Sequence, residues 1–119
     1  MAKINSYNFG FIVVDGKQHT HDVLILPDGT VKEREPGKGR LGSHNIRVSE
    51  IENLGSSQPD AIVVGTGASG LAKLSSEAQV YLQQVNSNLI ILPSSQAVQS
   101  FNRLAEEGKR VAALIHITC

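Results

Sequence analysis

Three apolar runs of strand length, separated by two helical patterns, limit the folds open to this chain more than any other feature. The runs are Ala61–Val64, Leu89–Leu92 and Val111–Ile117. Helical spacing is shown first by Ala78, Tyr81, Leu82 and Val85, and then by Ala97, Val98, Phe101, Leu104 and Ala105. A strand–helix–strand–helix–strand order predicts an α/β fold, in which helices cover a sheet and crossovers between parallel strands are right-handed.

Capping signals give the expected helix ends. Ser76 and Gln79 form a capping-box pattern, which predicts a helix that begins at Glu77. Pro93 with Ser94 or Ser95 predicts the start of the next helix, and Gly108 stands where the glycine after a helix belongs.

The first third of the chain predicts an antiparallel β-meander. A strand over Phe9–Val14 is followed by Asp15-Gly16, a dipeptide typical of hairpin turns. We expect the chain to return through Lys17 and His19 into a strand over Val23–Leu26. Pro27-Asp28-Gly29 then predicts a turn that leads into a third strand over Thr30–Arg34.

The segment 35–47 carries three glycines without sustained periodicity, which predicts an exposed loop. Ser49 and Glu52 form a second capping-box pattern, and we expect a short helix that ends at Gly55. Whether residues 1–5 are ordered stays open.

Length and composition favour a single domain over residues 1–119. The single cysteine, Cys119, allows no intramolecular disulfide. No run is long enough for a membrane span, and the N-terminus resembles neither a signal nor a transit peptide. We therefore expect a soluble cytoplasmic protein. Eleven basic and eleven acidic residues cancel, and only residues 32–47 lean basic, so we expect no nucleic-acid or membrane partner.

The stretch Gly65-Thr66-Gly67-Ala68-Ser69-Gly70 fits G-x-G-x-x-G, the pattern of dinucleotide-binding loops. Six residues separate Gly70 from the expected helix at Glu77, whereas a dinucleotide loop opens the helix directly. The end of the next strand, Leu92-Pro93-Ser94-Ser95, also lacks the acidic residue that binds the ribose. We therefore expect no dinucleotide cofactor, and two alternatives stay open: a structural turn, or a small-anion site at the end of a buried strand.

Histidines supply the other candidate site residues. His19 and His21 project from one face of a strand, but a zinc site needs three or four ligands, so we expect no metal. His116 and Cys119 lie three residues apart on a strand and should face opposite ways, so we identify no catalytic residue. The candidate ligand-binding residues are Gly65, Thr66, Gly67, Ser69, Gly70, His21 and His116.

Several segments together resemble a known family. They are His21-Asp22-Val23 with Pro27-Asp28-Gly29, Ala61–Gly67, Ile91-Leu92-Pro93, and Val111–Cys119. Their order resembles the Mth-domain family, small proteins that include an archaeal conserved hypothetical protein of Methanothermobacter, an adipogenesis-associated protein and a mitochondrial assembly factor for respiratory complex I. The resemblance implies a three-layer α/β fold with a mixed central sheet and an additional β layer.

The same resemblance implies no reaction, cofactor or catalytic residue, since the better-described members resemble assembly or regulatory factors that act through protein partners. This chain departs from the mitochondrial members because it lacks a targeting extension, and from others because it has no tryptophan after the Pro27-Asp28-Gly29 turn. We expect a non-enzymatic protein-interaction or assembly factor with no cofactor, and leave homo-oligomerisation open. The alternative is a small-ligand or anion-binding protein, or an enzyme, that uses Gly65–Gly70.

Overall fold

A computed structural model describes residues 2–34, 45–85 and 88–119 of the chain. The strands are β1 Ile4–Asn8, β2 Phe11–Val14, β3 Lys17–His19, β4 Val23–Ile25, β5 Val31–Glu33, β6 Asn45–Ile46, β7 Ala61–Thr66, β8 Lys73–Leu74, β9 Leu89–Leu92 and β10 Val111–His116. The helices are α1 Val48–Ser56, α2 Ser76–Val85 and α3 Ser94–Glu106.

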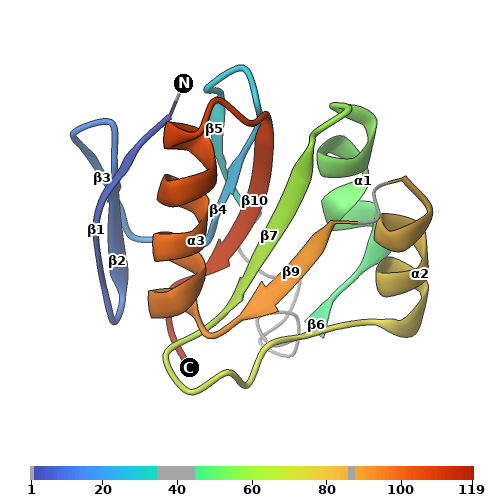
Figure 1. Ribbon diagram of the computed structural model, residues 1–119. Coiled ribbons are helices and arrows are strands. Elements are labelled where there is room, and N and C mark those ends of the chain that lie inside the picture. Colours follow the sequence, from blue (N-terminus) through green and yellow to red (C-terminus); the bar gives the residue numbers. More distant parts are fainter. Residues whose placement is uncertain (1, 35–44, 86–87) are drawn as a thin grey trace.

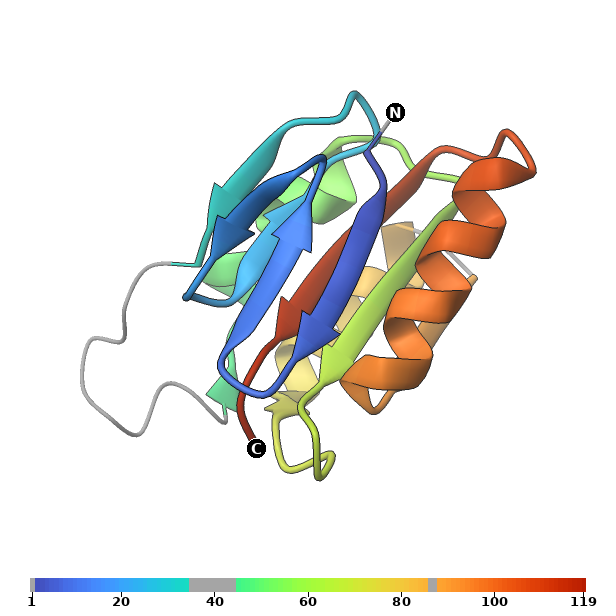
Figure 2. The same ribbon diagram turned by 90° about the vertical axis from the view of Figure 1, so that its left-hand side faces the viewer.

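A mixed sheet forms the centre of the molecule, with the strand order β5-β4-β10-β7-β9. β10, β7 and β9 run parallel, while β4 and β5 join as an antiparallel hairpin. Figure 1 shows α3 and the small sheet of β1, β2 and β3 on the left of this sheet, and α1 and α2 on its right. The fold is therefore the expected three-layer α/β arrangement. The expected β-meander is divided between two sheets: β2 and β3 pair with β1 in the small sheet, which lies beside α3 (Figure 2), whereas β4 and β5 belong to the central sheet.

β7 and β10 are buried along their whole length, because both faces of the central sheet are covered. A parallel strand covered on both faces reads as a continuous apolar run rather than as an alternating one. This is why Ala61–Val64 and Val111–Ile117 stood out in the sequence.

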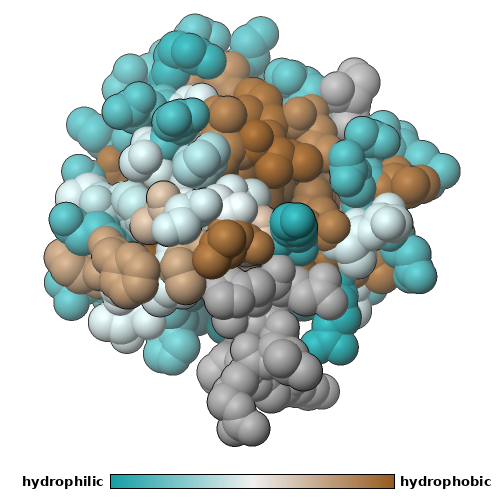
Figure 3. Space-filling view, turned by 90° about the horizontal axis from the view of Figure 1, so that it is seen from below, coloured by the Kyte–Doolittle hydropathy of each residue, from teal (hydrophilic) through white to brown (hydrophobic). Residues whose placement is uncertain are grey.

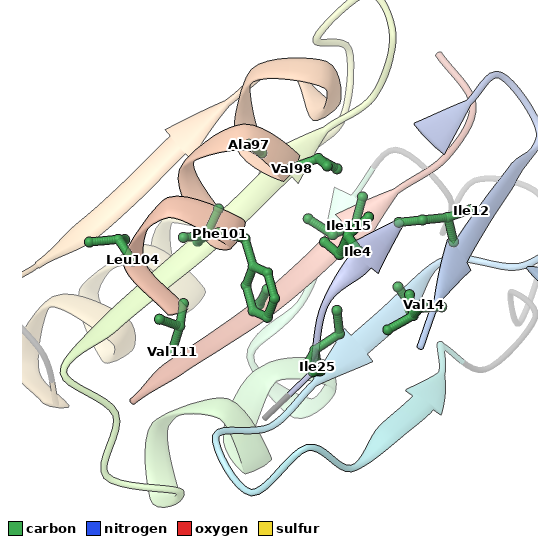
Figure 4. Packing of buried hydrophobic residues seen from close by; sticks show 14 of the residues in the cluster. Ile4, Ile12, Val14, Ile25, Ala97, Val98, Phe101, Leu104, Val111 and Ile115 are labelled. Carbon is green, nitrogen blue, oxygen red and sulfur yellow. The ribbon is translucent and has the colours of Figure 1, made fainter. Parts of the chain in front are cut away.

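The core is divided between the two faces of the central sheet. On one face, side chains of α3 such as Phe101 and Val98 meet Ile4 and Ile12 of the small sheet and Ile115 of β10 (Figure 4). On the other face, side chains of α1 and α2 pack with alternate residues of β7 and β10.

The N-terminal hairpins largely follow the sequence. Asp15 and Gly16 both adopt positive φ, as the predicted Asp-Gly hairpin turn requires. The strand expected over Phe9–Val14 instead starts at Phe11, because Gly10 with φ of 90° turns the chain back from β1. β1 occupies part of the segment whose order was left open, and Ile4 within it is buried.

Four expectations about loops and helix ends were wrong. The loop expected over 35–47 includes β6 at its end, with Ile46 buried; residues 35–44 lie outside the described part of the chain. At the start of α1 the Glu50 carboxylate accepts from the Arg47 amide at 3.0 Å, so the cap lies at Arg47 rather than at the expected Ser49. α2 starts at Ser76, and Ser75 caps it by accepting a hydrogen bond from the Ala78 amide.

Gly55 does not end α1 but lies inside it. A Cβ atom at this position would come within 2.7 Å of the Tyr81 ring, so the glycine allows α2 to approach α1 closely. The helix continues to Ser56.

Candidate functional site

Polar side chains gather where the parallel strands β7 and β10 end. His116 and Thr66 are register partners across these strands, and both are buried. The carboxyl ends of parallel strands are where α/β sheets generally bind ligands. This region is therefore the first candidate site.

Asp22, His116 and Thr118 form a chain of hydrogen bonds at this end of the sheet. The Asp22 Oδ2 atom lies 2.8 Å from His116 Nδ1, and His116 Nε2 lies 3.2 Å from Thr118 Oγ1. Asp22 Oδ1 accepts a further bond of 2.9 Å from the Ile117 amide. A carboxylate, an imidazole and a hydroxyl are thus connected in that order.

Arg34 ties this chain to α1. Its guanidinium donates to Asp22 Oδ2 at 2.9 Å and to both carboxylate oxygens of Glu50, while the side chain is only 6% exposed. Burial acts to raise the pKa of Asp22, but hydrogen bonds from His116, Ile117 and Arg34 outweigh it and leave that pKa below its ordinary value. Asp22 is therefore a carboxylate at neutral pH.

Ser94, the first residue of α3, connects the two strand ends. Its hydroxyl donates to the His116 carbonyl at 2.5 Å and accepts from the Gly67 amide at 2.8 Å. The Ser94 amide in turn donates to the Gly67 carbonyl at 3.0 Å. The buried serine thereby fixes the start of the glycine loop and the end of β10.

Several amides of the glycine loop already donate hydrogen bonds to partners within the protein. Besides Gly67, the amide of Ala68 donates to the Thr118 carbonyl and that of Gly70 to the Gly67 carbonyl. An anion at this loop would have to displace such bonds. α2 begins at Ser76, after β8, so no helix starts within residues 65–70 to direct its dipole at a phosphate.

Close packing explains two of the glycines. A Cβ atom at Gly65 would lie 2.8 Å from Ser94 Oγ and 3.2 Å from Ala97 Cβ. At Gly67, where φ is +103°, it would lie 2.7 Å from the Cys119 backbone. Both positions therefore require glycine so that α3 and the last residues can pack against the end of β7.

The two candidate histidines, His116 and His21, lie in different parts of the structure. His116 joins Thr66 and Gly67 at the strand ends, whereas His21 follows β3 and is 46% exposed. The Nδ1 atoms of His19 and His21 each lie 3.5 Å from a Glu33 carboxylate oxygen. Among the residues that the structure describes, no three His, Cys, Asp or Glu side chains lie close enough to bind a metal ion.

A second candidate site is the edge of the central sheet at β9. All four of its residues are apolar, none is fully buried, and Ile91 is 40% exposed. Within the described part of the chain, β9 pairs only with β7. Figure 3 shows the molecule from below, so its upper half corresponds to the front of Figure 1, where β9 is drawn. The broadest apolar surface in Figure 3 lies in the upper centre of the picture.

Sequence reasoning missed Asp22, Thr118, Arg34 and Glu50. The alternation of a strand gives one signal, since residues two apart share a face and His116 should have been paired with Thr118 rather than tested against Cys119. Asp22 lies 94 residues from His116, and no local pattern connects them. Arg34 was included in a basic surface stretch, although it is buried and paired.

Over the described residues, none of the helices combines the length and the apolar character that crossing a membrane requires.

Comparison with known proteins places the chain in a family. Residues 4–116 match the family model described as "Protein of unknown function (DUF498/DUF598)". The crystal structure of the conserved hypothetical protein PH1505 from Pyrococcus horikoshii OT3 is similar, with 33% identity, coverage of 98% of this chain and 99% of that one, and a TM-score of 0.81.

Two further structures extend the likeness. MT938 is 27% identical over the full length of both chains, with a TM-score of 0.82. A protein of Bordetella pertussis described as a Mth938-like domain shares the fold at 18% identity and a TM-score of 0.64, with coverage of 97% of this chain and 85% of that one. The chain belongs to the DUF498/DUF598 family of proteins of unknown function, the Mth-domain family.

Proposed function

We propose that this protein acts by binding a protein partner, which adds an extended segment to the open edge of β9. The observation that carries the proposal is this edge itself: four apolar residues, partly exposed, at the end of the central sheet. An open apolar edge strand is a template for strand addition by another chain.

The backbone of β9 has its alternate groups directed away from β7. The Ile62 amide donates to the Asn88 carbonyl at 3.0 Å, and Ile62 is opposite Leu89 in a parallel register. In such a ladder the bonds continue at every second residue, so Ile90 and Leu92 face β7. The N–H and C=O groups of Leu89 and Ile91 consequently point to the open side.

The other edge of the same sheet supports this assignment by contrast. β5 presents Val31, Lys32 and Glu33, and both charged side chains are exposed. Charged residues on an edge strand discourage pairing with another chain. β9 contains no charged residue, so the two edges differ in the feature that controls strand addition.

The partner's chemistry follows from the edge. A segment that pairs with β9 needs backbone donors and acceptors in extended conformation, and small apolar or β-branched side chains without charge. A strand of four residues is only about 13 Å long, so two copies paired through it alone would bury less area than a stable dimer needs. We therefore assign the edge to an extended segment of a different protein.

The test uses a short peptide of alternating valine and threonine with a lysine at each end, and measures amide hydrogen exchange residue by residue. We expect exchange at Leu89 and Ile91 to slow when the peptide binds. The same peptide with N-methyl groups on its edge-facing amides should have no effect, because it has lost its donors.

Two substitutions at one position provide the matched control. Ile91→Pro removes an N–H that faces outward and should abolish peptide binding without breaking the ladder to β7. Ile91→Thr keeps the N–H and should retain binding. The proposal is wrong if both variants bind equally, or if a second copy already protects Leu89 and Ile91 in a concentration-dependent way.

A further inference from the structure

We propose that Thr118 is a nucleophile that accepts acyl groups, and that His116 and Asp22 activate its hydroxyl. This activity is separate from the strand addition proposed for β9. It rests on the order of carboxylate, imidazole and hydroxyl at the end of β10.

Asp22 determines the state of the imidazole. A carboxylate can only accept, so His116 Nδ1 carries the proton that occupies the 2.8 Å contact with Asp22. In the neutral imidazole Nε2 then holds the lone pair, and the Thr118 hydroxyl, 3.2 Å away, is placed to donate to it. This is the arrangement by which a histidine serves as general base for a neighbouring hydroxyl.

Asp22, His116 and Thr118 form a triad, and the surrounding backbone and side chains hold it in position. Asp22 is fixed by the Ile117 amide and by Arg34, whose own amide donates to the Asp22 carbonyl. The Thr118 carbonyl accepts from the Ala68 amide at 2.7 Å. A reacting group that is held in position in this way loses little freedom when the reaction occurs.

His116 is more deeply buried than Thr118, as a buried base beside a more exposed nucleophile requires. His116 is 1% exposed, so its interaction with Asp22 is little screened by water. Thr118 is only partly buried and follows the last residue of β10, at the ligand-binding end of the sheet. Thr118 is thus the more exposed end of this chain of hydrogen bonds.

The reaction that fits is acyl transfer from a small, uncharged ester. Thr118 Oγ bonds to the ester carbonyl carbon while its proton passes to His116 Nε2, and Asp22 stabilises the imidazolium. Collapse breaks the bond to the leaving alkoxide, which takes the proton from His116. Water then attacks the acyl-threonine with His116 again as base, and releases a carboxylic acid and free Thr118.

An uncharged substrate follows from the electrostatics. Asp22 and Glu50 share the single guanidinium of Arg34, so these three side chains carry a net charge of −1 and disfavour an anionic substrate. Burying a further unpaired charge beside them would carry a large desolvation cost.

The test treats the full chain with 4-nitrophenyl acetate, measures release of 4-nitrophenolate, and maps the acetyl group by peptide mass spectrometry. We expect acetyl on Thr118. Thr118→Val should reduce acylation at least about 100-fold, and His116→Gln by a similar factor, the usual range for losing a general base. Thr118→Ser, which keeps a hydroxyl, should retain it.

Two controls separate this chemistry from its neighbours. Cys119→Ser removes the adjacent thiol and should leave acylation of Thr118 unchanged, and Thr20→Val should also have no effect because Thr20 is an exposed hydroxyl outside the triad. Acetyl found on Cys119 instead, a Thr118→Val variant that reacts at the wild-type rate, or a folded wild type that is never acetylated at Thr118 would each overturn the proposal. Ile91→Pro should keep the acylation, so the two proposals fail independently.

Discussion

Asp22 holds together segments that are far apart in the chain. Its carboxylate contacts His116 and Ile117 at the end of β10 and the Arg34 side chain that follows β5, and Arg34 reaches Glu50 on α1. Removing one partner of such a buried set leaves the others unpaired, which is generally more destabilising than the network is stabilising.

The first prediction is that Asp22→Asn lowers the free energy of unfolding by roughly 3 kcal/mol at pH 7. The folded-state pKa of Asp22 lies below the ordinary value of about 3.9, so the carboxylate contributes its full stability above that value and loses it as pH falls through the folded pKa. The difference between wild type and variant should therefore shrink below about pH 4.

Urea unfolding followed by circular dichroism at pH 7 and pH 3 measures this difference. The control is Asp28→Asn: Asp28 is exposed and accepts from the Thr30 amide, which lowers its pKa as well, so this variant should show the same pH trend with a much smaller loss than Asp22→Asn. A difference between wild type and Asp22→Asn that stays the same at both pH values would contradict the linkage.

At the residue scale, the sequence marked groups whose role depends on local geometry and missed those that depend on distant partners. The Asp15-Gly16 turn has the positive φ values that its residue types favour. His116 was identified as polar at the end of an apolar strand, but Asp22 is brought to it only by the pairing of β4 with β10. The residues around Asp22 do not indicate this pairing, because it joins strands that are far apart in the sequence.

At the element scale, length and continuity decide what can be predicted. β7, β9 and β10 are uninterrupted apolar runs, and α2 and α3 repeat at helical spacing, so all were expected. β6 and β8 are two residues each and pair with one another in parallel. Strands of two residues show no periodicity and depend on pairing with each other, which is why they could not be predicted from the sequence.

The N-terminus of α3 shows how one side chain positions an element. Ser94 is fully buried, and its hydroxyl satisfies the Gly67 amide and the His116 carbonyl together. The helix is thereby anchored to the ends of β7 and β10. The same hydroxyl explains why Gly65 admits no side chain.

The second prediction is that Ser94→Ala lowers the free energy of unfolding by about 2 kcal/mol, since it leaves a buried donor and a buried acceptor without a partner. Hydrogen exchange at the Gly67 amide should accelerate at the same time. Ser95→Ala is the control, because Ser95 is exposed on the next position of the helix and should change stability little. Equal effects of the two variants would show that the hydroxyl of Ser94 does not anchor the helix.

At the scale of the whole molecule, the central sheet joins two cores. The face under α3 carries Phe101 and the small sheet, and the opposite face carries Leu82 of α2. β7 and β10 contribute to both, since successive side chains along a strand point to opposite faces. A substitution that destabilises the core on one face should therefore also destabilise the core on the other face, because β7 and β10 contribute to both.

The third prediction follows from this shared sheet. Phe101→Ala should lower the free energy of unfolding by roughly 3–5 kcal/mol, because it removes a large buried ring and leaves a cavity. A single domain of this size usually unfolds in one cooperative step, so the loss should appear equally on both faces. Hydrogen exchange of the most protected amides should accelerate by the same factor in α3 and in α2. Leu82→Ala, made on the opposite face, should produce the same joint effect. If each substitution instead loosened only its own face, the two cores would unfold separately, and the sheet would be a partition between them rather than a connection.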